Sequence, residues 1–313
     1  MGKIAFLFPG QGSQQVGMGQ DFKESNEQSA QVFSLADERL EYSLSDIIAN
    51  GPVEELTRTE NTQPALLTTS IAILEALKEY DIQPDYTAGH SLGEYSALVA
   101  SEAMRFEDAV YAVHQRGMFM EEAVPAGIGA MSAVLGMDQD VLEKITTRVT
   151  SSGDSVQLAN LNCPGQVVIS GSKEGVEKAS ELAKSEGAKR IIPLQVSGPF
   201  HSELMKPAAE KMETILDKLS IIDAKVPVIA NVTAKPIEKT GEIRAKLIEQ
   251  IYSPVRWEET IRYLLDQDVD TFIEIGPGKV LSGLVKKIHR RAKTLAISNP
   301  DSLKEAVQKL KEV

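Results

Sequence analysis

The sequence is poor in cysteine and in long apolar runs, and its acidic residues outnumber its basic ones. Cys163 is the single cysteine among 313 residues, so no internal disulfide can form, which fits a cytoplasmic location. No segment reaches the roughly 18 apolar residues that a membrane-spanning helix needs, so we expect no membrane association. With 33 basic against 45 acidic residues, the net charge of −12 argues against non-specific binding of nucleic acid.

The remaining composition is that of an ordinary globular protein, with 42% hydrophobic and 25% charged residues. Short apolar runs alternate with helical patterns through both ends of the chain, which favours a parallel sheet with helices on both faces. Strands are predicted at 3–8, 85–89, 226–230, 271–275 and 294–297. Helices are predicted at 26–40, 63–80, 92–103, 106–120, 202–219 and 280–289. The segment 63–80 is apolar nearly all round, so we expect it to be buried on most faces.

The middle of the chain follows a different order. Between residues 127 and 196 the pattern is strand, helix, strand, strand, helix, strand, which is the ferredoxin-like split unit. The predicted elements are 131–135, 138–150, 155–161, 166–170, 173–186 and 189–196. We therefore predict an α/β fold in two parts. Residues 1–126 and 197–313 form a large α/β-hydrolase-like domain, and residues 127–196 form a small ferredoxin-like subdomain inserted in it.

A candidate nucleophile, Ser91, lies in the G-x-S-x-G stretch at residues 89–93, which follows a predicted strand and opens a predicted helix. This is the context of a nucleophile elbow. There the backbone N–H groups at the helix N-terminus, including that of Leu92, can stabilise an oxyanion. The alternative is a plain strand-turn-helix with a capping serine. Because neighbouring side chains in a tight elbow diverge, we expect His90 to be a packing or orienting residue.

The candidate general base is His201. Of the four histidines, His114 falls within a helix pattern and His289 within a basic stretch, whereas His201 lies in a loop that follows a strand and precedes a helix. Imidazole is the commonest base for a serine nucleophile, and a helix N-terminus disfavours its protonated form. The alternative is a structural histidine.

One arginine lies on an apolar helix stripe. Ala109, Val113, Arg116 and Met120 follow helical spacing, so Arg116 faces the interior. A buried guanidinium needs an acid or an anionic ligand, and its two parallel donors suit a carboxylate. The alternatives are a structural pair with an acid such as Glu94 or an extended conformation that reaches solvent.

Five motifs, taken in their order along the chain, resemble those of the malonyl-CoA:acyl carrier protein transacylase family. This family includes the acyltransferase domains of fatty-acid and polyketide synthases. The resemblance extends from Phe6 to about Leu284. The motifs are Phe8-Pro9-Gly10-Gln11-Gly12, Gly89-His90-Ser91-Leu92-Gly93 with the following Glu94-Tyr95-Ser96-Ala97, Gln115-Arg116-Gly117, Gly198-Pro199-Phe200-His201-Ser202 and Glu274-Ile275-Gly276-Pro277-Gly278.

The resemblance implies a role for each matching position. Ser91 would carry the malonyl group and His201 would take its proton, while the backbone N–H groups of Gln11 and Leu92 would form the oxyanion hole. Arg116 would hold the malonyl carboxylate. Gln250 would orient His201 through its backbone carbonyl, so no third acid is needed. The candidates for such an acid between Ser91 and His201 in chain order, Asp138, Asp140 and Asp154, fall in the inserted segment. Phe200 and Leu92 match the malonyl-using branch, and Asn160 or Asn162 would touch the acyl group.

The implied activity is malonyl transfer from malonyl-CoA to the phosphopantetheine thiol of acyl carrier protein in fatty acid biosynthesis, through a ping-pong reaction. Coenzyme A and the carrier are then its partners, no cofactor or metal is needed, and we expect a monomer. Because carrier proteins are acidic, Lys189, Arg190, Lys286, Lys287, Arg290 and Arg291 are candidates for docking, or are simply solvated charges. Three alternatives stay open: a serine thioesterase or esterase, a polyketide acyltransferase and a non-catalytic carrier-binding module.

Overall fold

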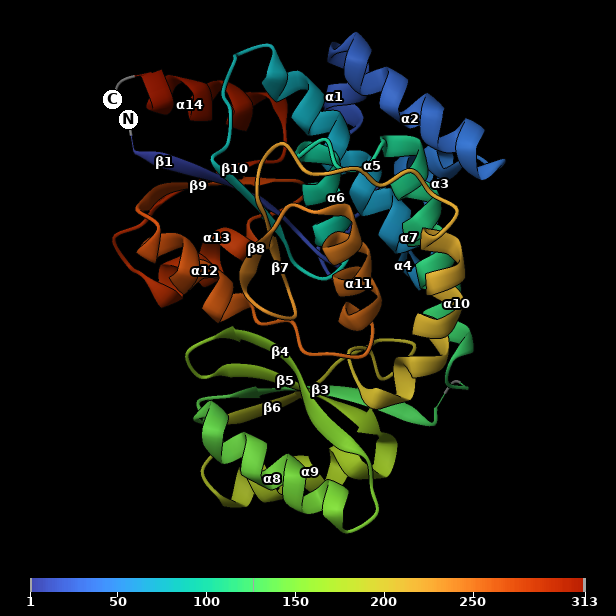
Figure 1. Ribbon diagram of the computed structural model, residues 1–313, viewed down its shortest axis with the longest axis vertical. Helices are drawn as coiled ribbons and strands as arrows, with labels where there is room; N and C mark the ends of the chain where they lie inside the picture. Colours follow the sequence, from blue (N-terminus) through green and yellow to red (C-terminus); the bar gives the residue numbers. More distant parts are fainter. Residues whose placement is uncertain (1, 126, 312–313) are drawn as a thin grey trace.

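A computed structural model describes residues 2–125 and 127–311. A large part occupies the upper two thirds of Figure 1, and a small part, coloured green to yellow-green, lies below it. The two parts share backbone hydrogen bonds. The Leu161 N–H donates to the Val255 carbonyl at 2.9 Å, and the Val255 N–H donates to the Ala159 carbonyl at 2.8 Å. A strand of the small part is therefore fastened directly to the large part.

The large part contains most of the helices and one mixed sheet. Before the small part come β1 (Lys3–Phe8), α1 (Gln20–Ser25), α2 (Glu27–Leu40), α3 (Leu44–Asn50), α4 (Val53–Thr57), α5 (Thr59–Lys78), β2 (Tyr86–Gly89), α6 (Gly93–Ala100) and α7 (Phe106–Glu122). After it come the 3-10 helix η1 (Glu203–Met205), α10 (Lys206–Leu216), β7 (Val228–Ala230), β8 (Lys235–Ile237), α11 (Thr240–Gln250), α12 (Trp257–Asp266), β9 (Val269–Ile275), α13 (Val280–Ile288), β10 (Lys293–Ile297) and α14 (Pro300–Lys311).

The large sheet is parallel except at one edge. Within the described ranges, six strands pair in the order β10-β9-β1-β2-β7-β8, and only β8 runs antiparallel to its neighbour. Strand β1 alternates in the way that a two-sided core requires. Ile4, Phe6 and Phe8 pack with α5, α6 and α7, while Ala5 and Leu7 pack with α12 and α13 on the other face. The predicted parallel sheet covered by helices on both faces is confirmed.

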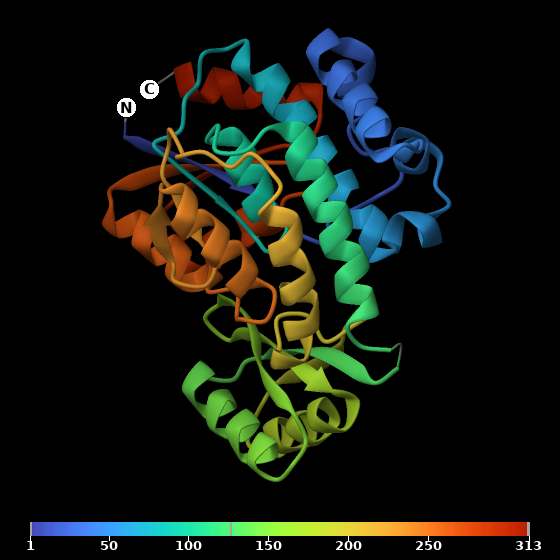
Figure 2. The ribbon, with the colours of Figure 1, turned by 45° about the vertical axis from the view of Figure 1, so that its right-hand side comes forward.

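The small part is a separate antiparallel sheet with two helices. Its elements are β3 (Gly129–Leu135), α8 (Gln139–Ser151), β4 (Val156–Cys163), β5 (Gln166–Ser172), α9 (Lys173–Ser185) and β6 (Arg190–Pro193). In the described residues four strands pair in the order β4-β5-β3-β6. Figure 2 shows α8 and α9 on the side of this sheet away from the large part. Val134 of β3 packs on these helices, whereas Met131 and Ala133 join the core of the large part.

Two predicted helices differ from the structure by more than their last few residues. The predicted helix 63–80 begins earlier, at Thr59, so Pro64 lies inside α5. A proline there cannot donate to the Glu60 carbonyl, four residues back. The His114 ring accommodates this by placing its Nδ1 2.9 Å from the same oxygen. The predicted helix 202–219 is divided into η1 and α10 and ends at Leu216.

The buried character of α5 is confirmed, since 17 of its 20 residues are buried. Within the described part of the chain, no helix is long and apolar enough to cross a membrane.

Candidate active site

The candidate site forms where three neighbouring strands end. Strands β1, β2 and β7 are parallel neighbours, so their carboxyl ends meet at one edge of the sheet. The segments that follow them carry Gln11, Ser91 and Asn231. This edge is where open parallel sheets bind ligands.

Ser91 lies at a sharp turn between β2 and α6, with the left-handed φ of 54°. Two glycines permit this turn. A Cβ on Gly89 would lie 1.9 Å from the carbonyl carbon of Gly93, and a Cβ on Gly93 would lie 2.2 Å from the Phe8 carbonyl oxygen. Only glycine fits at either position. The strand-turn-helix context predicted for the elbow is therefore present.

The Ser91 hydroxyl lies against the imidazole of His201. Ser91 Oγ is 2.8 Å from His201 Nε2, and His201 Nδ1 is 2.8 Å from the backbone carbonyl oxygen of Gln250. Because a carbonyl can only accept, Nδ1 carries the proton and Nε2 has the free lone pair. Gln250 is the last residue of α11, where helix carbonyls lack intrahelical partners. The three groups have the geometry of a serine nucleophile, its base and an orienting acceptor.

His201 is held neutral by its surroundings. Its side chain is buried in the protein, and this burial, together with the nearby Arg116 guanidinium, lowers its pKa to about 3. The backbone carbonyl of Gln250 acts in the opposite direction and favours the imidazolium. The resting site therefore has an imidazole that is ready to accept a proton.

The lowered pKa predicts an unusual pH profile for Ser91 acylation. An imidazole with an ordinary pKa would give a loss of rate centred near pH 6.5, because its protonated form cannot act as a base. For His201 we expect no such loss, so the acylation rate at saturating donor stays within about threefold between pH 5.5 and 8. Rapid-quench measurement of the acylated fraction checks this. A tenfold fall centred near pH 6.5 would contradict it.

Gln11 and Leu92 both line the cavity beside Ser91. Leu92 is the N-cap residue of α6, and neither its N–H nor that of Gln11 donates to any group of the described residues. The Ser91 N–H, in contrast, donates to Asn231 Oδ1 at 2.7 Å. Free N–H groups at a helix N-terminus favour a developing negative charge. The pair predicted from the sequence as the oxyanion hole is thus available.

Arg116 of α7 points into the same space. Its side chain is 1% exposed. Its Nη1 donates to Gln63 Oε1 at 2.7 Å, and its Nη2 donates to Ser91 Oγ at 3.1 Å and to Gln250 Oε1 at 2.9 Å. Within residues 2–125 and 127–311 it forms no ion pair, and its Nε has no hydrogen-bond partner. Two alternatives that the sequence left open for Arg116 are therefore wrong. It forms no direct ion pair with Glu94, and its side chain does not extend to solvent.

Glu94 does not contact Arg116 directly, because the side chain of Gln250 lies between them. Gln250 Nε2 donates to Glu94 Oε2 at 2.8 Å and to the Ser91 carbonyl at 2.9 Å. Burial raises the pKa of Glu94 to about 7, so near neutral pH it does not fully compensate the guanidinium. A buried charge without a full counter-ion is costly, and a carboxylate ligand would supply one. Arg116 is placed to bind an anionic group next to the nucleophile.

These residues line a cavity of about 310 Å³, which is at the small end of ligand-binding pockets. Asn160 of β4, Phe200, Met120, Met131 and Leu194 form other parts of its wall. Asn162 is not among the lining residues. Instead its Oδ1 lies 2.9 Å from His90 Nε2. Residues 160 and 162 would share a face in a regular strand, but the register of β4 shifts between Leu161 and Cys163.

The other histidines do not reach Ser91 Oγ. His90 contacts Asn162 and packs against Trp257, with 5.5 Å between the ring centroids, which agrees with the packing role among the two that we expected. His114 contacts the Glu60 carbonyl, and His289 is exposed at the end of α13. In the part of the chain that the structure describes, no cluster of His, Cys, Asp and Glu could hold a metal ion.

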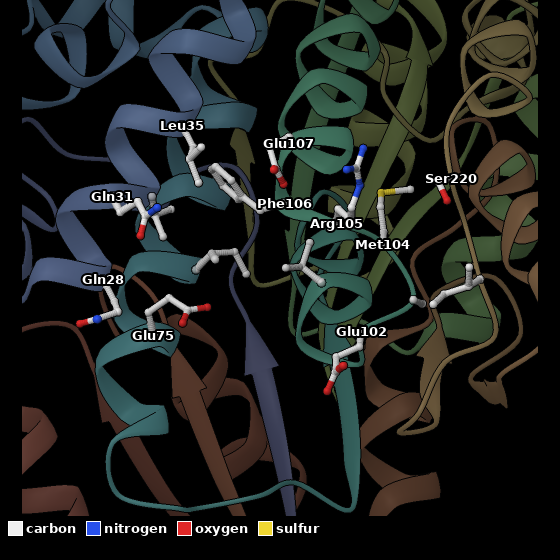
Figure 3. Close-up of a pocket in the computed structure, with 15 residues that line it drawn as sticks. Gln28, Gln31, Leu35, Glu75, Glu102, Met104, Arg105, Phe106, Glu107 and Ser220 are labelled. Carbon is white, nitrogen blue, oxygen red and sulfur yellow. The ribbon is translucent and has the colours of Figure 1, made fainter.

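A larger cavity of about 560 Å³ lies elsewhere, between α2, α5 and the loop that precedes α7 (Figure 3). Leu35 and Phe106 point into it, and Glu75, Glu102 and Glu107 lie at its rim. It shares no lining residue with the cavity of Ser91 and contains no serine–histidine pair. The cavity of Ser91 is therefore identified by its side chains and not by its size.

Sequence reasoning missed two residues that contact the catalytic groups. Gln63 of α5 accepts from Arg116, and Asn231 accepts from the Ser91 backbone. Neither belongs to a local motif, because their partners lie 53 and 140 residues away along the chain. The one available signal for Asn231 was its place directly after an apolar strand, where functional groups gather in parallel sheets.

The site is that of a serine acyl transferase, and comparison with known proteins agrees. The family model described as the acyl transferase domain matches residues 5–306. The chain is 64% identical over 312 residues to the malonyl CoA-acyl carrier protein transacylase of Bacillus subtilis, covering 100% of this chain and 98% of the relative. It is 46% identical over 304 residues to the transacylase of the same name from Staphylococcus aureus, covering 97% and 98%.

Solved structures give the same result. The malonyl CoA-acyl carrier protein transacylase of Coxiella burnetii superposes with a TM-score of 0.96 at 42% identity, covering 98% of each chain. A malonyl-transacylase solved in complex with a type II polyketide acyl-carrier protein has a TM-score of 0.95 at 42% identity, covering 98% of this chain and 99% of that one. This chain belongs to the malonyl CoA-acyl carrier protein transacylase family, so the resemblance drawn from the five motifs is confirmed.

Proposed function

We propose that this enzyme transfers a malonyl group from malonyl-CoA to the phosphopantetheine thiol of acyl carrier protein through a malonyl-Ser91 intermediate. The observation that carries the proposal is the unpaired, buried Arg116 beside the Ser91–His201 pair. A hydrolase of uncharged esters would have no use for a buried cation next to its nucleophile. A donor with a free carboxylate supplies the counter-ion that Arg116 lacks.

In the first half-reaction, Arg116 binds the malonyl carboxylate through two parallel hydrogen bonds. Ser91 Oγ attacks the thioester carbonyl carbon while its proton passes to His201 Nε2. The oxyanion accepts hydrogen bonds from the Gln11 and Leu92 N–H groups, and the Gln250 carbonyl stabilises the imidazolium. The C–S bond then breaks, and His201 returns the proton to the departing coenzyme A sulfur.

The second half-reaction reverses these steps with a different thiol. His201 takes the proton of the phosphopantetheine thiol, and its sulfur attacks the malonyl-Ser91 carbonyl carbon. The ester bond breaks, and Ser91 recovers its proton from His201. Since one thioester replaces another, the exchange needs no ATP, metal or other cofactor. This order of events is a ping-pong mechanism.

Product analysis separates this function from its alternatives. With malonyl-CoA and phosphopantetheinylated carrier protein, we expect malonyl-carrier to form at least about 100 times faster than free malonate. Rapid release of malonate that is independent of the carrier would indicate a thioesterase. A protein that forms no acyl adduct and only binds the carrier would be a non-catalytic module.

We place the reaction in fatty acid biosynthesis, because the curated relatives bear a general transacylase name. One structural relative serves a type II polyketide carrier, so the polyketide pathway is the alternative. The ratio of kcat/KM for the two kinds of carrier protein from the source organism distinguishes them. A tenfold preference for the fatty-acid carrier supports the proposal, and the reverse preference overturns it.

For carrier docking we propose the basic surface around the β4–β5 turn. Lys287 of α13 donates to Gln166 Oε1 at the turn, and the Gly165 carbonyl accepts from the Gly136 N–H beside Lys189. The turn also follows Asn162, the partner of His90. Lys189, Arg190, Lys286, Lys287, Arg290 and Arg291 are all exposed. A cationic surface next to the elbow suits an acidic carrier despite the net charge of −12.

Charge reversal tests the docking surface. For the double variant Lys189→Glu/Lys287→Glu we expect KM for the carrier to rise about tenfold at low salt, with kcat within about twofold, because exposed charges act mainly on association. Lys304→Glu is the matched control, since Lys304 is an exposed lysine on α14. An equal effect of the control, or no effect of the double variant, would reject this surface.

The finer description of the fold is also a proposal. We propose that residues 127–196 form a ferredoxin-like subdomain inserted in an α/β-hydrolase-like domain made of 1–126 and 197–313. The chain order β3-α8-β4-β5-α9-β6 and the sheet order β4-β5-β3-β6 support it. The boundary residues 1, 126 and 313 lie outside the described residues. We further propose a cytoplasmic monomer; gel filtration at micromolar concentration tests the oligomeric state.

A further inference from the structure

Asn231, directly after β7, binds the backbone on both sides of His90. Its Oδ1 accepts from the Ser91 N–H at 2.7 Å, and its Nδ2 donates to the Gly89 carbonyl at 2.7 Å. The side chain is fully buried. One amide thus spans the turn that carries the nucleophile, using one acceptor and one donor.

Asn231 is itself held in place. Its backbone N–H donates to Glu94 Oε2 at 3.1 Å, and its carbonyl accepts from the Arg256 N–H at 2.9 Å. Glu94 also accepts from Gln250, whose Nε2 donates to the Ser91 carbonyl. Ser91 is therefore bound through its N–H by Asn231 and through its carbonyl by Gln250, and Glu94 joins the two.

These hydrogen bonds determine which backbone N–H groups are free to donate to an oxyanion. Three consecutive N–H groups, those of Ser91, Leu92 and Gly93, start at the elbow. The Gly93 N–H donates to the His90 carbonyl at 3.0 Å and the Ser91 N–H donates to Asn231. Of the three, only the Leu92 N–H has no partner among the described residues, and Leu92 lines the cavity. Ser91 is also in a left-handed conformation that non-glycine residues seldom adopt, so it needs support from its surroundings.

We propose that Asn231 is a positioning residue for acyl transfer. Its amide holds the Ser91 turn so that the Oγ faces His201 and the Leu92 N–H faces the developing oxyanion. This inference rests on the malonyl transfer proposed above. It predicts that loss of Asn231 affects the rate of the chemical step rather than the binding of malonyl-CoA, because Asn231 does not line the cavity.

The test compares Asn231→Ala with Asn61→Ala. Asn61 is a matched control: it is 6% exposed and also makes two side-chain hydrogen bonds, to Tyr42 Oη and the Glu55 carbonyl, outside the site. For Asn231→Ala we expect the single-turnover rate of Ser91 acylation to fall about 100-fold, the loss typical of one transition-state hydrogen-bond donor, with KM for malonyl-CoA within about threefold. For Asn61→Ala we expect a similar drop in Tm but a rate within about twofold of the parent.

Asn231→Asp adds a rescue that a packing role would not give. A protonated carboxyl group can accept from the Ser91 N–H and donate to the Gly89 carbonyl, as the amide does, whereas a carboxylate would repel that carbonyl. The charged or titratable groups around it are Glu94, Arg116, His90 and His201. Dividing by the parent rate removes the titration that both proteins share, and the negative charge of the neighbouring Glu94 favours the protonated form of the introduced carboxyl group. We expect that ratio to rise at least about tenfold from pH 8 to pH 6.

The outcomes separate two failures. If the parent forms no malonyl-Ser91 adduct, the proposed function fails. If the parent forms the adduct, the positioning role is overturned by either of two results. Folded Asn231→Ala acylates within threefold of the parent, or its only change is a higher KM for malonyl-CoA. Should Asn231→Ala not fold, Asn231→Asp decides alone: a flat ratio between pH 6 and pH 8 contradicts the role, and recovery at pH 6 supports it.

Discussion

Replacing His201 with alanine is expected to lower the acylation rate of Ser91 by about 10³- to 10⁵-fold, in line with the loss of a catalytic base from other serine enzymes. The reason is the single 2.8 Å contact between His201 Nε2 and Ser91 Oγ, which no other base in the described structure replaces. Rapid quench followed by mass measurement of the acylated fraction gives the rate directly.

His114→Ala is the control for this experiment. His114 contacts a backbone carbonyl on α5 and does not line the cavity, so we expect its loss to reduce Tm while the acylation rate stays within about threefold. If His201→Ala acylated within tenfold of the parent, His201 would be a structural residue and another group would take the Ser91 proton.

Replacing Arg116 with alanine is expected to remove much of the selectivity for malonyl-CoA over acetyl-CoA. The ratio of kcat/KM for malonyl-CoA to that for acetyl-CoA should fall by about 10³-fold, because a buried charge-assisted pair is lost for malonyl only. Acetyl transfer should gain in the process, since the unpaired guanidinium that an uncharged acyl group would bury is gone. Steady-state kinetics with both donors measures the ratio.

Arg116→Lys refines this prediction. A lysine keeps the positive charge but cannot make two parallel hydrogen bonds to a carboxylate, so we expect a selectivity between that of the parent and of Arg116→Ala. Arg105→Ala, at the exposed start of the same helix, is the control and should leave the ratio unchanged. Equal losses for malonyl and acetyl in Arg116→Ala would show that Arg116 supports Ser91 Oγ and does not select the donor.

The parts of the fold that sequence patterns predicted best are those with strong local periodicity. Strand β1 and the helix α7 begin where the pattern predicts, because burial on defined faces fixes them. Helices α11 and α12 were not predicted, although α11 supplies Gln250. The start of α5 was missed because Pro64 signals a helix start, whereas here His114, from another helix, compensates the carbonyl that Pro64 leaves free.

For the candidate site too, local motifs predicted some features, whereas contacts between distant segments could not be predicted. Ser91 and His201 belong to local motifs, and the structure brings them together as expected. The environment of Arg116 could not be read from spacing, since its partners Gln63 and Gln250 come from two other helices. Whether Glu94 would pair with it depended on the Gln250 amide that lies between them. Contacts of this kind arise only when distant segments pack.

The most direct test of the central claim is the mass of the intact protein after brief exposure to malonyl-CoA and, separately, to acetyl-CoA. We expect one malonyl group per chain, located on Ser91 by peptide mapping, and little or no acetyl adduct under the same conditions. No adduct with malonyl-CoA, or an adduct on a different residue such as Cys163, would contradict the account.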